Sequence, residues 1–172
     1  MSHFEPNIDT LKLCISLAKE ALEAGDDPFG SVLVDSNGRI LQQDRNRVLT
    51  GKNGDGKADA TLHPELALAV WAQYNLEPEE RAQTTMYTSG EHCAMCSAAH
   101  AYCGLGRIVY ISSTAQYQTW LIEFGRGSGK LRPLAINDVA PAIQVQGPIV
   151  GLDEEVKELH RQKILGSKGA SS

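Results

Sequence analysis

Short segments rich in β-branched residues alternate with segments of helical periodicity along the chain. This alternation limits the fold more than any other feature, because it is typical of domains in which helices cover a central sheet. The expected strands are 31–35, 39–46, 84–89, 107–112 and 143–145. The expected helices are 8–24, 61–75, 96–102, 115–124 and 152–165. The pattern therefore predicts a layered α/β domain with a mixed sheet of about five strands sandwiched by helices.

Glycine-rich and polar segments separate these elements. Asn37-Gly38 is a hairpin-turn signal between the first two expected strands. Residues 50–60 (TGKNGDGKADA) predict an exposed loop, and residues 77–83 predict a polar connection. Residues 166–172 (GSKGASS) predict a frayed, flexible tail.

The composition is that of a globular protein, with 42% apolar and 22% charged residues. A chain of 172 residues is long enough to form one domain with a full core, over residues 1–172. The net charge of −5 argues against a nucleic-acid-binding face, which needs clustered Lys and Arg. The apolar runs are far shorter than the roughly 20 residues of a membrane helix. Because the first residues also lack a signal-peptide pattern, we expect a cytoplasmic protein with reduced cysteines and no membrane contact.

Two short motifs carry the chemistry. His63-Pro64-Glu65 opens an expected helix, and Cys93 and Cys96 are spaced so that both sulfur atoms can reach one metal ion. A structural zinc site normally uses four protein ligands, whereas a catalytic site uses three and leaves one position for water. Three ligands with a glutamate two residues from the histidine therefore favour a catalytic zinc. The alternatives are a structural zinc site and a pair of reduced core cysteines.

These residue types predict a hydrolytic chemistry. Zinc lowers the pKa of a bound water toward about 7, which supplies hydroxide at neutral pH. Glu65 suits the transfer of the water proton to a ring nitrogen and a leaving amine. Helix N-termini favour thiolate over thiol. Because His63 and Cys93 each stand at an expected helix start, the two starts must face each other across neighbouring strands.

The combination of H-x-E with a later C-x-x-C resembles the zinc-dependent cytidine and nucleobase deaminase superfamily. Within it, the chain is similar to the guanine deaminase and tRNA adenosine deaminase branch over roughly residues 10–160. Further segments carry the resemblance, namely 28–34 (PFGSVLV), 45–48 (RNRV), 95–99 (MCSAA), 106–110 (GRIVY) and 146–148 (QGP).

The resemblance implies a three-layer fold of the cytidine deaminase type, with zinc as the cofactor. It implies that His63, Cys93 and Cys96 bind the metal. It also implies that Glu65 is the catalytic proton shuttle and that Asn46 contacts the base. The family's assembly implies a homodimer or a larger oligomer.

Two residues depart from the family pattern. His92 stands where the family usually has proline, which leaves a polar group beside the pocket and an opening for altered ligation. Pro64 stands where the family has a small residue, whose backbone N–H binds the 2-carbonyl of cytosine-type substrates. Proline has no N–H, and an unpaired buried carbonyl costs about 1–3 kcal/mol. We therefore expect cytosine and cytidine to be poor substrates and a purine-type ring to be accepted more easily.

Three aromatic residues are candidates for contact with a planar base. Tyr117 and Trp120 follow the strand 107–112, where an aromatic ring could stack on the substrate. Packing in the core or at a dimer interface is the alternative for both. Phe29 has the same two interpretations, as a core residue or as part of the pocket lining.

The remaining histidines and cysteines have structural interpretations. We expect His100 to support the site or the core rather than to bind metal, and His160 to face solvent. Cys14 and Cys103 are expected to be small buried apolar residues. The loop 50–60 directly precedes His63, so a lid over the pocket and an inert insertion are both open.

The sequence thus predicts a zinc-dependent hydrolytic deaminase that converts a ring C–NH₂ to C=O and releases ammonia. The expected substrate is a small aminated base or nucleoside of purine type, with guanine first. Within the same class, the alternative is a tRNA adenosine (wobble) deaminase, which the acidic balance opposes. An alternative of another class is a non-catalytic deaminase-like zinc module, which would have no need of Glu65.

Overall fold

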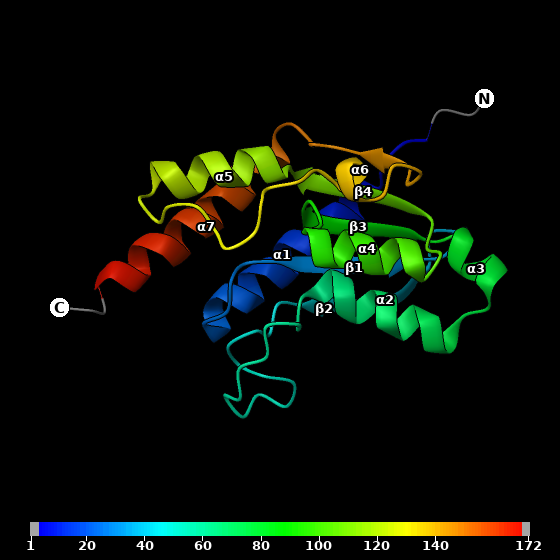
Figure 1. Ribbon diagram of the computed structural model, residues 1–172, viewed down its shortest axis with the longest axis horizontal. Coiled ribbons are helices and arrows are strands. Elements are labelled where there is room, and N and C mark those ends of the chain that lie inside the picture. The colour runs from blue at the N-terminus through cyan, green and yellow to red at the C-terminus, as the bar shows by residue number, and fades with distance from the viewer. Residues whose placement is uncertain (1–3, 170–172) are drawn as a thin grey trace.

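The computed structural model describes residues 4–169, with the backbone alone for residues 167–169. Within this range one five-stranded sheet runs in the order β2-β1-β3-β4-β5 (Figure 1). The strands are β1 (Gly30–Val34), β2 (Ile40–Arg45), β3 (Thr85–Gly90), β4 (Arg107–Ser112) and β5 (Val145–Gln146). β1 pairs antiparallel with β2 and β3, whereas β3, β4 and β5 run parallel. The sheet is mixed, as the sequence predicts.

Helices cover both faces of the sheet (Figure 1). One face carries α1 (Ile8–Ala24), α5 (Thr114–Glu123) and α7 (Leu152–Gly169). The other face carries α2 (Pro64–Asn75), α4 (Ala94–Tyr102) and the short α6 (Ile136–Val139), and α3 (Pro78–Ala82) connects α2 to β3. This is the three-layer α/β architecture that the alternation of elements and the resemblance predict.

The side chains of β1 show why the sheet needs a helical layer on each side. Val32 and Val34 join the core beneath α1, α5 and α7. Leu33, between them, joins the core beneath α2 and α4. Since successive side chains of a strand point to opposite faces, a strand buried on both faces has a continuous apolar sequence instead of an alternating one. The run SVLVD has this character, and every residue of β1 is buried.

The directions of the strands place the start of β1 and the ends of β3 and β4 at the same edge of the sheet. Because β1 is antiparallel to β3, its first residues lie beside the last residues of β3, with Ser31 opposite Thr88. β4 is parallel to β3 and also ends there, with Ser112 opposite Gly90. α4 begins directly after β3. The edge formed by the start of β1 and the ends of β3 and β4 therefore collects residues from distant parts of the chain.

Several element boundaries differ from the predicted ones. The predicted polar connection 77–83 contains α3, which buries no side chain and so has no apolar periodicity to detect. α6 has only four residues, too few for a periodic pattern. β5 begins at Val145 instead of residue 143. α7 continues to Gly169, so it includes part of the predicted tail, while residues 170–172 lie outside the described residues.

In the described part of the chain, no helix is long and apolar enough to cross a membrane.

The close approach of α1 to β1 depends on the absence of a side chain at Gly30. A Cβ atom there would lie 2.5 Å from the Cys14 carbonyl oxygen and 2.7 Å from the Ala18 nitrogen, both backbone atoms of α1. We expect Gly30→Ala to lower the free energy of unfolding by about 2 kcal/mol or more, because overpacking forces the backbone to move. Urea denaturation measures this change.

The matched control is Gly129→Ala, where an added Cβ has nothing within 4 Å. It should leave the urea midpoint nearly unchanged. Equal midpoints for the two variants would contradict the tight contact between α1 and β1.

Candidate active site

Two helix starts meet at the edge where β3 and β4 end. His63 is the N-cap residue of α2, and Cys93 is the N-cap residue of α4. Cys96 lies in the first turn of α4, so the C-x-x-C spacing places both sulfur atoms on the same side of that helix. Pro64 occupies the first helical position of α2, where its missing N–H removes no helical hydrogen bond. α2 and α4 pack against each other, which brings the two N-termini together.

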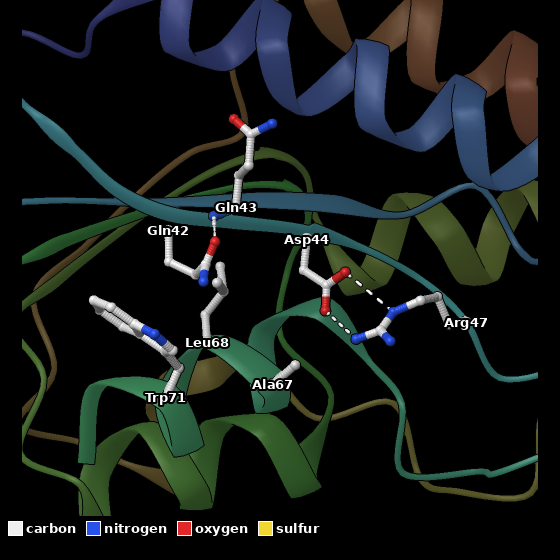
Figure 2. Close-up of a pocket in the computed structure, with 7 residues that line it drawn as sticks. All are labelled: Gln42, Gln43, Asp44, Arg47, Ala67, Leu68 and Trp71. Atoms are coloured by element: carbon white, nitrogen blue, oxygen red, sulfur yellow. Dashed lines mark hydrogen bonds and ion pairs between the residues drawn. The ribbon is translucent and has the colours of Figure 1, made fainter. Parts of the chain in front are cut away.

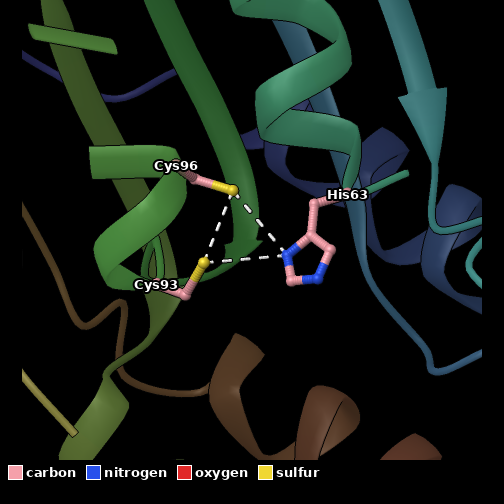
Figure 3. Close-up of side chains that lie close together, drawn as sticks. All are labelled: His63, Cys93 and Cys96. Carbon is pink, nitrogen blue, oxygen red and sulfur yellow. Dashed lines mark hydrogen bonds between the residues drawn. The ribbon is translucent and has the colours of Figure 1, made fainter. Parts of the chain in front are cut away.

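The three predicted metal ligands converge on one point (Figure 3). The Nδ1 atom of His63 lies 3.7 Å from the Sγ atoms of both Cys93 and Cys96, and the two Sγ atoms are 3.5 Å apart. A tetrahedral zinc with Zn–S bonds of about 2.3 Å and Zn–N bonds of about 2.0 Å separates its ligand atoms by roughly 3.5–3.8 Å. The geometry and the donor set therefore fit a zinc ion held by three protein ligands.

The pKa shifts of these three side chains also suit metal binding. The hydrogen bond between the Cys93 and Cys96 sulfur atoms, aided by the neighbouring His63, lowers the pKa of Cys93 to about 4. The bond to Cys93 and the burial of the side chain raise the pKa of Cys96. The hydrogen bond with Cys93 raises the pKa of His63. Without a metal, one thiolate is therefore already present, and it lies at the positive end of the α4 dipole.

Glu65 lies directly beside the three ligands. Its side chain is buried, and its Oε2 atom is 3.9 Å from the Sγ atom of Cys96. The Thr88 hydroxyl donates to Oε1 at 3.2 Å and itself accepts a hydrogen bond from Ser31. Burial raises the pKa of Glu65 to about 7. A carboxyl group with such a pKa can take up and release a proton at neutral pH.

Asn46 lies at the same edge, as the resemblance implies. It is buried, and its N–H donates to the Phe29 carbonyl at 2.9 Å. The next residue, Arg47, donates its N–H to the carbonyl of Leu62, which precedes His63. The Asn46 Oδ1 atom accepts the Val48 N–H at 3.0 Å. Among residues 4–169 the Asn46 Nδ2 group has no bonded acceptor, so this donor is available to a ligand.

The predicted aromatic residues pack near one another, and Tyr117 lies against the core cluster that contains Trp120. The Phe29 ring lies against the end of β3, because a Cβ at Gly90 would be 2.8 Å from it. The Tyr117 ring packs edge-on against Phe29 at 5.6 Å between centroids. Trp120 is buried in the core beneath α1, α5 and α7. Of the two interpretations weighed for Trp120, core packing is the one with a structural basis.

His160 was predicted to face solvent, and this prediction is wrong. Its side chain is only 2% exposed and packs 4.9 Å from the Phe29 ring and 4.8 Å from the Tyr117 ring. Its Nε2 atom has no hydrogen-bond partner among the described residues. The spacing of Val156, His160 and Ile164 along α7 could have revealed this, because residues four apart share a helix face and the two apolar neighbours are buried.

His92 and His100 form a buried pair behind the ligands. Both are fully buried, their ring centroids are 5.4 Å apart, and neither belongs to the ligand group. His100 pairs through Nε2 with the Gly106 carbonyl, whereas both ring nitrogens of His92 have no partner within residues 4–169. Burial lowers the pKa of both residues. His92 therefore stays neutral beside the site and does not replace a ligand.

Two surface hollows lie away from the ligand triangle. One, of about 310 Å³, is lined by residues of β2, α2 and the segment between them, including Gln42, Asp44 and Trp71 (Figure 2). The other, of about 510 Å³, is enclosed by the loop 52–60 itself. Neither is lined by a predicted ligand or by Glu65, so the chemistry of the residues locates the candidate site better than the shape of the surface. A lid function for the loop 50–60 stays a prediction.

Comparison with known proteins points to one family. The profile of the MafB19-like deaminases matches residues 7–145. The chain is similar to a probable cytosine deaminase of Schizosaccharomyces pombe, with 32% identity over 155 residues, 85% of this chain and 86% of that protein. It is similar to the guanine deaminase of Bacillus subtilis, with 34% identity over 90 residues, 52% of this chain and 53% of that protein.

A solved structure supports the fold independently. The guanine deaminase of Nitrosomonas europaea superimposes with a TM-score of 0.69, covering 95% of this chain and 87% of that chain. The two sequences are 18% identical. This likeness confirms the cytidine deaminase type of fold.

Metal binding can be tested through one ligand. We expect Cys96→Ser to abolish tight zinc binding, since a three-ligand site tolerates the loss of one thiolate poorly. Cys103→Ser, at the far end of α4, is the control and should bind about one zinc per chain, the content that we also expect of the unaltered protein. Atomic absorption after dialysis measures the content. Equal zinc in the two variants would place the metal elsewhere.

The burial of His160 predicts a pH dependence of stability. Burial lowers its pKa to about 3, so the folded protein keeps the ring neutral while the unfolded chain protonates it below about pH 6.5. The cost of keeping the ring deprotonated in the folded state is small above pH 6.5 and grows as the pH falls toward 3. We expect His160→Phe to gain about 2 kcal/mol in unfolding free energy relative to the unaltered protein between pH 7.5 and pH 5.

Urea denaturation at the two pH values measures this difference. Tyr117→Phe, a change in the same cluster, should show no such dependence, because burial raises the pKa of Tyr117 to about 12. A pH-independent difference for His160→Phe would mean that the pKa of this ring is the same in the folded and the unfolded protein.

Proposed function

Because the chain belongs to the MafB19-like deaminase family, we propose that it hydrolytically deaminates a small aminated heteroaromatic base or nucleoside of purine type, with guanine as the first candidate. One observation carries the proposal. The triangle of His63, Cys93 and Cys96 fits a zinc ion, and the carboxyl group of Glu65 lies next to it. A structural zinc site would need neither an open fourth position nor a buried carboxyl group beside it.

The reaction divides between the metal and the chain. Zinc bound at this site supplies an activated water whose pKa lies near 7. Glu65 would accept one proton of the attacking water and deliver it to the ring nitrogen. It would then carry the remaining proton of the added hydroxyl group to the amine, so that C–N cleavage leaves C=O and releases ammonia. The hydrogen bond from Thr88 keeps one carboxyl oxygen fixed while Oε2 faces the ligands.

Asn46 and Phe29 supply the substrate contacts in this proposal. The available Nδ2 donor of Asn46 suits an acceptor on the edge of a heteroaromatic ring. The Phe29 ring, together with Tyr117, supplies an apolar surface that suits a planar base. Trp120 belongs to the layer beneath and supports these rings from the core.

Pro64 bears on the choice of base. It is buried between a predicted ligand and the proton shuttle, and it presents no N–H toward the pocket. A cytosine-type carbonyl directed at this position would lose its donor, which disfavours cytosine by about 1–3 kcal/mol. The relative from Schizosaccharomyces pombe is named a probable cytosine deaminase, so the two lines of argument differ, and a substrate comparison decides between them.

Ammonia release from the zinc-loaded protein tests the proposal. The panel contains guanine, adenine, cytosine, their nucleosides and tRNA. We expect turnover of a purine, guanine first, and a loss of about 10²–10⁴-fold in kcat for Glu65→Gln, because this change removes the proton carrier. Zinc content is measured in both proteins, so that a loss of metal is distinguished from a loss of proton transfer.

The other outcomes identify the alternatives. Faster turnover of cytosine than of any purine would overturn the argument from Pro64. Turnover of an adenosine in tRNA alone would make the protein a tRNA deaminase. A zinc-loaded protein inert toward all these substrates would be a non-catalytic module.

A further inference from the structure

Asp26 is a fully buried carboxylate outside the catalytic group. It follows Gly25, which ends α1 in a left-handed conformation with φ 97°. Its Oδ1 atom accepts the N–H groups of Leu49 and Thr50 at 2.6 and 3.0 Å. Its Oδ2 atom accepts from the Thr50 hydroxyl at 2.6 Å and from Arg45 Nη1 at 2.9 Å. Burial raises the pKa of Asp26, but these hydrogen bonds outweigh it and hold the pKa below its usual value.

These partners lie on both sides of Asn46. Arg45 precedes it, and the Arg45 Nη1 atom also donates to the Asn46 carbonyl at 2.7 Å. Leu49 and Thr50 follow it. Asp26 therefore fastens the segment 45–50 at both ends, while the backbone of Asn46 is bonded to Phe29 in between. The backbone of Asn46 is thus held by hydrogen bonds, and its side chain accepts the Val48 N–H through Oδ1.

A solvent-exposed loop follows the segment 45–50 directly. Residues 52–60 are exposed, and Gly51, Gly54 and Gly56 adopt left-handed conformations with φ between 68° and 81°. The bonds to Thr50 are therefore the last contacts with Asp26 before a long polar loop. The loop also returns to this segment, because the Gly51 N–H donates to the Arg47 carbonyl and the Asp59 N–H donates to the Val48 carbonyl, both at 2.8 Å.

We propose that Asp26 is a positioning residue that holds the segment 45–50, and with it Asn46, beside His63. The proposal rests on the function proposed above, since it assigns to Asn46 the contact with the base. Asp26 itself does not touch the substrate. Its effect on the reaction passes through Asn46 and concerns the binding of the ring more than the transfer of protons.

The variant Asp26→Asn changes charge but not size. Its amide oxygen can still accept from Leu49 and Thr50, whereas its NH₂ group faces Arg45, which is also a donor. We expect KM for the preferred substrate to rise by about tenfold, with kcat changed much less and zinc content unchanged. Thr50→Val, which removes one bond and keeps the charge, should give a smaller rise in KM and serves if Asp26→Asn folds poorly.

The matched control is Asp35→Asn. Asp35 also accepts two backbone N–H groups and pairs with an arginine, but in the turn between β1 and β2, away from the site. This change should leave KM unaltered. A similar rise in KM for both variants would show a general loss of structure and would overturn the proposal.

A double-mutant cycle shows whether Asp26 acts through Asn46. If it does, Asp26→Asn adds little to the loss in kcat/KM that Asn46→Ala already causes. Independent, multiplicative losses would overturn the proposal. Hydrogen exchange of amides 47–50, faster in Asp26→Asn than in Asp35→Asn, tests the anchoring without any turnover. Inactivity of the unaltered protein would count against the proposed function, whereas unchanged exchange would count against the anchoring.

Discussion

The structure depends on two helix N-termini being held side by side at one edge of the sheet. His63 and Cys93 are N-cap residues of α2 and α4, and 3.7 Å separates their ligand atoms. That distance requires α2 and α4 to pack on the same face and requires β3 to end where α2 begins. The antiparallel pairing of β1 with β3 then brings Phe29 and Asn46 to the same edge. The mixed sheet is thus the simplest way to surround one metal position with residues from three parts of the chain.

The sequence predicts most of this arrangement, for identifiable reasons. β4 matches its predicted range because its apolar run is bounded by clear polar residues, and α1 matches because an amphipathic pattern ends in glycine. The meeting of His63 with Cys93 and Cys96 was also predictable, because a histidine and two cysteines in a C-x-x-C pair are typical ligands of one zinc ion. The cytidine deaminase type of fold follows from the motif and is confirmed by the superposition.

Other features could not be read from local patterns. α3 and α6 lack an apolar face of useful length, so nothing distinguishes them from loops. Asp26 looks like an ordinary residue at a helix end, because its partners lie 19 to 24 positions later in the chain. Both ring nitrogens of His92 and the Nε2 atom of His160 are buried without partners among the described residues. Since an unpaired buried polar group costs free energy, polarity alone predicts such residues at the surface, and only their neighbours reveal the burial.

The position of β2 at the end of the sheet has a further consequence. The outer side of an edge strand has unpaired backbone N–H and C=O groups. Another extended chain can pair with them, which promotes aggregation. Here two of the backbone N–H groups that β1 does not use, those of Gln43 and Arg45, are bonded by the side chains of the preceding Gln42 and Asp44 (Figure 2 shows the first). Side chains of β2 itself thus accept the hydrogen bonds that a neighbouring strand would otherwise accept. An intruding chain would have to displace them before it could extend the sheet, so the polar side chains of β2 oppose the addition of a sixth strand at this edge.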